Sequence, residues 1–149
     1  IVLTGTIAVP LMVMQVARRE YATLEQKKGG GVIGSVGNAL VSTLILVLVA
    51  LASLPLLLIP FAGMVVPIML AAWFNKRIYQ YDALMDHASP DERAKLLSLH
   101  RGSLWKIGLL TAALTLVPLV NFFAPALAGL AFVHFCLGSL QDLRRATAS

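Results

Sequence analysis

The sequence is poor in charged residues and almost free of cysteine. Only 13% of its 149 residues are charged, and its single cysteine cannot form an internal disulfide. Soluble domains are about a quarter charged, whereas this chain is 58% hydrophobic and has a mean hydropathy of +0.83. These shortages exclude a disordered tail, a disulfide scaffold and an ordinary cytosolic enzyme domain. They predict an all-α, polytopic integral membrane protein with a single membrane domain over residues 1–149.

An initiator methionine is also missing, because the chain begins at Ile1. We therefore expect an N-terminally incomplete chain with further sequence upstream. Residues 1–17 lack a basic leading region and an evident cleavage motif, so they are not typical of a signal peptide. We expect residues 1–28 to form a first helix and a basic loop.

Charge is absent altogether from residues 1–17, 29–75 and 107–141. A charge at the centre of a bilayer costs at least ~2.5–3.5 kcal/mol, so these stretches are predicted to be the membrane segments. The two longer stretches each exceed the ~20 residues of a single span. Each of them can therefore enter the membrane and return.

Both long stretches carry turn-forming residues near the middle: Pro55, Pro60, Gly63 and Pro67 in the first, and Pro118, Asn121 and Pro125 in the second. Proline breaks or kinks a helix, and Gly and Asn tolerate the positive φ of a tight turn. The pattern predicts two helical hairpins, the first within residues 29–85 and the second, with a tail, within residues 107–149. At one constant shift Pro60, Gly63 and Pro67 superpose on Pro118, Asn121 and Pro125, which indicates an internal repeat.

The lengths of the hairpin arms leave the depth of the hairpins open. The return arm of the first hairpin, residues 64–74, would be only ~16 Å long as a helix. The hydrocarbon core of a bilayer is ~30 Å thick. Either the helix continues through residues 76–82 with those side chains snorkelling to the interface, or the hairpin is re-entrant.

Hairpins of this kind place every charged residue on one side of the membrane. The charges fall within residues 18–28, 76–106 and 142–145, and Lys and Arg outnumber Asp and Glu by 12 to 7. Because basic residues collect on the cytoplasmic side, we expect a multi-pass protein of the bacterial inner membrane with cytoplasmic charged loops. The expected partners of this basic face are anionic lipid headgroups rather than nucleic acid.

Residues 89–92 predict a helix start in the loop between the hairpins. Ser89 is typical of an N-cap, Pro90 of the first helical turn, and Glu92 closes a capping box. Leucines then mix with basic residues at helical spacing. The pattern predicts a cytoplasmic amphipathic helix within residues 86–106, lying in the membrane interface.

Several runs of residues resemble the etoposide-induced-protein domain family, whose best-known bacterial branch is the CysZ sulfate permeases. They are Arg19-Glu-Tyr21 with Lys28-Gly-Gly30, Arg77-Ile-Tyr-Gln-Tyr-Asp-Ala-Leu84 with Asp86-His-Ala-Ser-Pro-Asp-Glu-Arg93, and Pro118-Leu-Val-Asn-Phe-Phe-Ala-Pro125 with Ala131-Phe-Val-His-Phe-Cys-Leu137. The resemblance implies an inner-membrane protein with long spanning helices and short hairpins that enter only part of the bilayer. It also implies sulfate uptake, but the sulfate-contacting Gly-Leu-Arg element of the CysZ branch is not found in this chain, so no binding site is carried over.

Arg101, Ser103 and Lys106 are the candidates for binding an anion. They open the first arm of the second hairpin, and a helix N-terminus offers free N–H groups and the positive end of its dipole to an anion such as sulfate. The alternative is a basic interfacial belt that contacts lipid phosphates.

Asn121 and His134 are the candidates for a transport pathway. Asn121 lies at the far-side turn of the second hairpin, and His134 is the ionisable residue inside an apolar arm, where such residues are often functional. The alternatives are that Asn121 only forms the turn and that His134 hydrogen-bonds to a neighbouring helix. His134 and Cys136 lie on different sides of a helix, so we expect no metal site.

No nucleophile and base pattern, phosphate-binding loop or zinc-ligand spacing occurs in the sequence, so we expect neither catalysis nor a cofactor. Trp73 and Trp105 flank the central charged loop and are expected to be interfacial anchors.

Two hypotheses about function remain. The first is a CysZ-type permease for sulfate or another small anion.

The second hypothesis is a non-catalytic accessory or structural subunit. Such a subunit would pack against a larger membrane protein complex, and a homo-oligomer is a further possibility. Small residues at Ala124, Ala128 and Gly129 suit close contact between helices.

Overall fold

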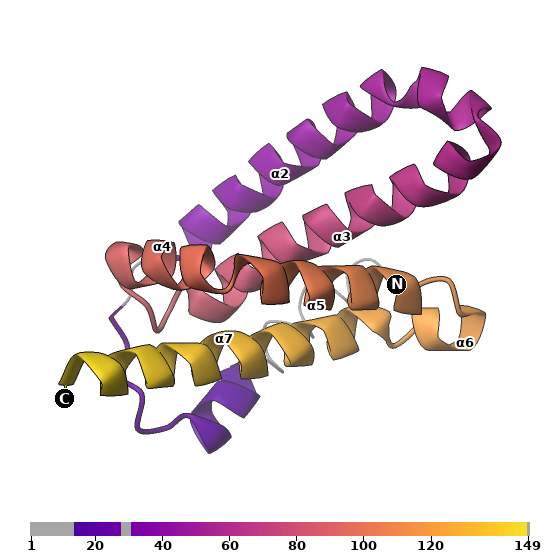
Figure 1. Cartoon of the computed structure of the whole chain (residues 1–149). Coiled ribbons are helices and arrows are strands. Elements are labelled where there is room, and N and C mark those ends of the chain that lie inside the picture. The colour runs from indigo at the N-terminus through magenta and orange to yellow at the C-terminus, as the bar shows by residue number, and fades with distance from the viewer. Residues whose placement is uncertain (1–13, 28–30, 149) are drawn as a thin grey trace.

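The computed structural model describes residues 14–27 and 31–148, and every regular element in that part of the chain is helical. A short helical segment over residues 14–20 comes first. It is followed, as Figure 1 shows, by α2 (Val32–Ala52), the 3-10 helix η1 (Leu54–Leu58), α3 (Pro60–Leu84), α4 (Pro90–Leu99), α5 (Arg101–Leu114), α6 (Pro118–Asn121) and α7 (Ala124–Ala148). The predicted all-α class is confirmed.

The first hairpin is made of α2 and α3, and its tip lies earlier in the chain than the sequence suggested. The tip is η1, with Pro55 in its first turn, and Pro60 begins α3. Proline suits these positions because the first turn of a helix needs no backbone donor. Gly63, which was expected to form the bend, lies within α3 instead, and Pro67 lies inside the same helix, within the predicted return arm of residues 64–74. The N–H group of Gly63 donates to the carbonyl of Ile59 at 3.0 Å, so the helix has already begun there.

The return arm α3 extends well beyond the apolar stretch. It runs for 25 residues, past Lys76 and Asp82, which gives a length of ~37 Å. Its partner α2 has 21 residues and a length of ~31 Å. The helix therefore continues through residues 76–82, and both arms are as long as the ~30 Å hydrocarbon core is thick. The re-entrant alternative stays a prediction.

The second hairpin is made of α5 and α7, joined through the short α6. Its first arm begins at Arg101, directly after α4, so residues 86–106, which were predicted to contain one amphipathic helix, contain α4 and the first residues of α5. The position of this segment in the membrane interface stays a prediction. The capping box of α4 is confirmed. The Ser89 hydroxyl accepts from the Glu92 N–H at 3.3 Å, and the Glu92 carboxylate accepts from the Ser89 N–H at 3.0 Å.

The predicted internal repeat does not extend to the geometry of the two tips. Pro60 and Pro118 both begin a helix, but Pro60 begins a long return arm whereas Pro118 begins the short tip helix α6. Asn121 ends α6 at the bend, as expected of a turn residue, whereas its counterpart Gly63 lies inside a long helix. Both tips nevertheless point to the same side of the molecule in Figure 1, opposite to α4 and the C-terminus.

The core lies between α7, α3, α4 and α5, and α2 stands apart from it. Helix α7 buries one face at helical spacing, with Phe132, Cys136 and Leu140 each fully inaccessible to solvent. Ala72 of α3 is equally buried where Gly108 of α5 crosses it. Helix α2 packs mainly on α3 and diverges from the rest towards its tip (Figure 1).

Two helices in the described part of the chain are long and apolar enough to cross a membrane. They are Ile33–Ala52, with a mean hydropathy of 2.2, and Ala124–Ala148, with a mean hydropathy of 1.4. The most apolar window of α2 is only 6% buried, so it is not the core helix of a soluble domain. The structure therefore supports a membrane protein by length, composition and exposure.

Candidate functional site

Four cations from three helices converge at the end of the molecule where α4 lies. Lys76 and Arg77 come from α3, Arg93 from α4 and Arg101 from the start of α5. We call these four residues the cationic junction. The residues of η1 and α6, at the opposite end, carry no charge.

Aromatic rings support three of the four cations. The Lys76 ammonium lies 4.9 Å from the centre of the Trp105 ring, and the Arg77 guanidinium lies 5.5 Å from that of Trp73. The Arg93 guanidinium lies 4.7 Å from the ring centre of Tyr81. A cation over an aromatic face is attracted by the ring without being neutralised. The rings therefore hold these cations in place while their charge remains available.

Two guanidinium groups of the junction keep an unsatisfied donor. Arg77 Nε and Arg93 Nη1 are buried, and neither has a hydrogen-bond partner within the part of the chain that the structure describes. A buried polar group without a partner costs about 1–3 kcal/mol, more if it is charged. An anionic oxygen placed at either donor would satisfy it and offset that cost.

A seam of polar residues on α2 faces the cationic end of α3. Ser35, Asn38 and Ser42 are three and four positions apart, so they share one face of α2. Asn38 Nδ2 donates to the Arg77 carbonyl at 3.3 Å, and the Ser35 hydroxyl donates to the Asp82 carboxylate. The Ser42 hydroxyl is fully buried, with no hydrogen-bond partner among the described residues. Sequence reasoning missed this seam, although its spacing within an apolar stretch was a usable signal.

The predicted anion-binding residues are only partly brought together. Arg101 lies one helical turn before Trp105, and its charge is close enough to that of Lys76 to repel it, so Arg101 belongs to the junction. Lys106 is exposed and lies on a different side of α5 from Arg101, because five residues are about 1.4 turns. Ser103 is half-buried.

The helix start at Arg101 is also less open than the sequence suggested. Only His100 separates α4 from α5, so α5 follows a preceding helix rather than a loop. The His100 N–H donates to the Leu96 carbonyl at 3.0 Å, and the His100 carbonyl accepts from the Leu104 N–H at 3.0 Å. His100 therefore ends α4 through its N–H group and begins α5 through its carbonyl, so one of the four N–H groups at the start of α5 is already used.

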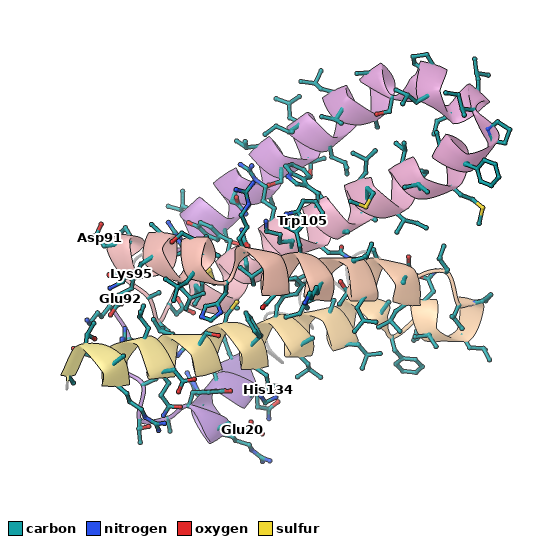
Figure 2. All side chains as sticks on the ribbon, in the orientation of Figure 1. Glu20, Asp91, Glu92, Lys95, Trp105 and His134 are labelled. Carbon is teal, nitrogen blue, oxygen red and sulfur yellow. The ribbon has the colours of Figure 1, made fainter. Side chains whose placement is uncertain are left out.

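The two pathway candidates lie far from the junction in the chain and have different surroundings. Asn121 is exposed at the uncharged tip. His134 Nδ1 lies 3.2 Å from a carboxylate oxygen of Glu20, and the Tyr21 hydroxyl donates to the His134 carbonyl at 3.2 Å. Figure 2 shows His134 and Glu20 on the same side of α7. His134 thus bonds to a neighbouring segment, which was the structural alternative for it.

A second charged cluster is fully occupied by internal contacts. Arg144 donates from Nε and Nη2 to the two Glu92 oxygens at 3.0 Å each, and its Nη2 also donates to the His87 carbonyl at 2.6 Å. Arg144 Nη1 donates to the Glu25 carbonyl at 2.9 Å, and Lys27 Nζ lies 3.1 Å from Glu92. The Arg144 hydrogen bonds, above all, hold the pKa of Glu92 at about 2.

This cluster has a structural role that the sequence did not reveal. It ties the end of α7 to the start of α4 and to the segment before α2. The sequence analysis placed Arg144 in the basic face that was expected to contact anionic lipid headgroups, and nothing in its spacing pointed to Glu92. For metals, residues 14–27 and 31–148 contain no group of three or more His, Cys, Asp or Glu that could hold an ion.

Comparison with known proteins gives one match. The family model described as sulfate transporter CysZ/etoposide-induced protein 2.4 matches residues 1–125. No curated protein and no solved structure matches the chain. The family match covers the first hairpin, α4, α5 and α6, and so includes the whole cationic junction.

Proposed function

The chain belongs to the sulfate transporter CysZ/etoposide-induced protein 2.4 family, and from this premise we propose that it is a permease for sulfate or another small oxyanion. The family is of the transporter type, which agrees with the expectation of a protein without catalytic activity. Two helices fit a membrane span, and a cluster of cations lies at one end of the helices.

The observation that carries the proposal is the pair of unsatisfied donors on Arg77 and Arg93. Hydrogen bonds from a guanidinium to an anionic oxygen are about twice as strong as neutral ones. An oxygen of a tetrahedral oxyanion can accept from either of these donors. Asn38 and Ser42 extend polar character from this point along α2, and the exposed Asn121 lies at the far end of the second hairpin.

We place the protein in the bacterial inner membrane as a multi-pass protein, with the cationic junction on the cytoplasmic side. The excess of Lys and Arg at that end and the absence of charge from both tips support this orientation. The junction would then be the point at which a transported anion meets the cytoplasm.

The test is uptake of labelled sulfate into proteoliposomes. Arg77→Gln and Arg93→Gln are each expected to lower uptake by about tenfold or more, because a hydrogen bond to a charged group contributes about 1.5–3 kcal/mol. Arg101→Ala, Ser103→Ala and Lys106→Gln probe the candidates named from the sequence. Arg145→Gln removes an exposed charge at the far end of α7 and is the matched control. Uptake no better than in empty liposomes, or equal loss in Arg145→Gln, would contradict the proposal.

A second candidate, an accessory subunit, is favoured by the exposed leucines of α2. Leu40, Leu44, Leu48 and Leu51 form one stripe, and each is more than half exposed. Ala124, Ala128 and Gly129, which were expected to contact a partner, are buried inside this chain and cannot do so. Stoichiometric co-purification with another membrane protein in mild detergent would favour the subunit, and a lone monodisperse species would count against it.

A further inference from the structure

An apolar cleft lies between α2, α3 and α5, next to the cationic junction. Its volume is about 390 Å³, which is within the range of small-molecule sites. Its walls are entirely aliphatic or aromatic and include Ile45, Val49, Met69, Trp73 and Trp105. No function described so far uses this space.

The cleft exists because the two hairpins diverge. Helix α2 packs mainly on α3, whereas α3 also packs closely on α5 and α7 (Figure 1). The side chains of Ile45 and Val49 therefore face Trp105 of α5 across a space that no residue of the described chain fills. Figure 2 shows Trp105 projecting from α5 towards the first hairpin.

One end of the cleft is formed by tryptophan rings that carry cations. Trp73 and Trp105 line it, and these are the two rings that carry the Arg77 guanidinium and the Lys76 ammonium. Arg101 adds a third positive charge near Lys76. None of these three cations has an ion pair with an acidic side chain of the described residues.

We propose that this cleft binds one acyl chain of an anionic phospholipid, whose phosphate lies against Lys76 and Arg101. An apolar slot that ends at unpaired cations is complementary to a molecule with an apolar chain and an anionic head. Interfacial tryptophans and clustered basic residues are the usual partners of anionic headgroups. A helix from a second copy fits less well, because it would need an acidic residue at the depth of Lys76. The inference does not depend on transport.

The two tryptophans of the chain both line the cleft, so its occupancy can be measured without a label on the protein. Purified protein is mixed with phosphatidylglycerol that carries bromine on its acyl chains, which quenches tryptophan fluorescence on contact. Phosphatidylcholine with the same brominated chains is the neutral control. We expect about fivefold stronger quenching by phosphatidylglycerol at low occupancy, and a loss of this preference at high ionic strength.

Variants separate the headgroup from the chain. Lys76→Gln with Arg101→Gln is expected to abolish the preference for phosphatidylglycerol, and Lys76→Arg to retain it. Val49→Phe fills the cleft and is expected to reduce quenching by both lipids, whereas Leu48→Phe, at the neighbouring position outside the cleft, leaves it unchanged. Glycerol 3-phosphate, which has the phosphate without chains, is expected not to compete.

Besides assignment of the cleft to a second copy of the chain, three results would overturn the proposal. They are equal quenching by the two lipids, equal effects of Val49→Phe and Leu48→Phe, and competition by glycerol 3-phosphate, which would indicate a site for free phosphate. Quenching that falls as protein concentration rises would assign the cleft to a second copy of the chain. Circular dichroism of each variant confirms that its helices are intact, and sulfate uptake is measured separately, so the two proposals can fail independently.

Discussion

Helices α2 and α7 are both candidate membrane spans, yet they relate to the rest of the protein in opposite ways. The more apolar of the two, α2, has a mean hydropathy of 2.2 and is 6% buried, whereas α7 has a mean hydropathy of 1.4 and is 39% buried. In water the more apolar helix would be the more buried one. The reversal indicates that α2 is solvated by something other than water. In lipid, packing is decided by shape and small residues rather than by hydropathy.

Small residues explain why the second hairpin packs tightly and the first does not. A Cβ atom added to Gly108 of α5 would lie only 2.6 Å from the Ala72 carbonyl oxygen of α3. Ala128 and Gly129 are likewise buried on α7. On α2, Gly34 closely approaches the Tyr81 hydroxyl of α3, whereas Gly37, nearer the first tip, has nothing within 4 Å of an added Cβ. Glycine is thus a contact point where α5 crosses α3 and near the start of α2, and it is exposed farther along α2.

The largest difference between the two regions should come from a matched pair of phenylalanine truncations. Phe132→Ala removes a fully buried ring of α7 that stacks on Tyr79 at 5.8 Å, and we expect a loss of about 3–5 kcal/mol. Phe61→Ala, at the first tip, removes a ring that is 84% exposed and should change stability by less than about 0.5 kcal/mol.

Thermal unfolding in mild detergent checks this pair. The only cysteine, Cys136, is buried, so a thiol-reactive dye reports the loss of the core, and circular dichroism reports the helices independently. Equal midpoints for the two variants would contradict the division into a packed region and an exposed one.

The next largest loss of stability is expected from the charged cluster of Arg144 and Glu92, which ties α7 to α4. Glu92→Gln weakens the two-pronged contact with Arg144, and we expect a loss of about 2–3 kcal/mol. Asp142→Asn is the control, because its pair with Arg145 is exposed and 3.9 Å long, and it should cost less than about 1 kcal/mol.

The same cluster should make stability depend on pH. The pKa of Glu92 is lowered from an ordinary value of 4.5 to about 2, so the folded state favours the ionised form. The contribution of the ionised Glu92 carboxylate to the free energy of unfolding is therefore complete above pH 4.5 and is lost as the pH falls from 4.5 towards 2. Unfolding midpoints measured across this window should fall in the parent protein and fall less in Glu92→Gln. If the unfolding midpoints of the parent protein and of Glu92→Gln change in parallel with pH, Glu92 is not the group that makes stability depend on pH in this range.

A third pair of variants examines the glycines directly. Gly108→Ala forces apart α3 and α5 at their crossing, and we expect a loss of about 1–3 kcal/mol. Gly37→Ala adds a methyl group in open space on α2 and should be neutral or slightly stabilising, because alanine favours helix. Thermal midpoints of both variants check the prediction, which a loss in Gly37→Ala would refute.

The smallest change in stability is expected when either of two buried hydroxyl groups, those of Thr111 and Ser42, is removed. Thr111→Val removes a donor to the Gly108 carbonyl at 3.0 Å and should cost about 1 kcal/mol. Ser42→Ala removes a hydroxyl without a partner among the described residues, so stability should stay the same or rise slightly. If Ser42 serves the proposed anion pathway, its variant should lower sulfate uptake while leaving the thermal midpoint unchanged.

Much of the fold could be predicted from the pattern of charge. The uncharged stretches contain both tips, and the capping box at Ser89 and Glu92 forms as expected. The exact bends could not be predicted, because proline marks a helix start as readily as a helix end. Pro60 begins α3 and Pro67 lies inside it, so the bend forms at η1 before both.

The candidate site was predictable only in part. Arg101 was identified from its place at the start of an arm, and it does belong to the cationic junction. Arg77 and Arg93 were treated as loop charges, because their common surroundings depend on how three helices meet. Arg144 was assigned to lipid, although it bonds to residues distant in the chain.

The amino-acid sequence by itself determined that the chain is helical and apolar and that neither hairpin tip carries a charge. Helix formation and the avoidance of charge in lipid act on neighbouring residues, so they can be deduced from local pattern. Only the tertiary structure decided which apolar helix is buried, which arginines keep free donors and where a cleft lies beside them. Those outcomes depend on close approach between segments far apart in the chain, such as Gly108 against Ala72, and composition does not specify such approaches.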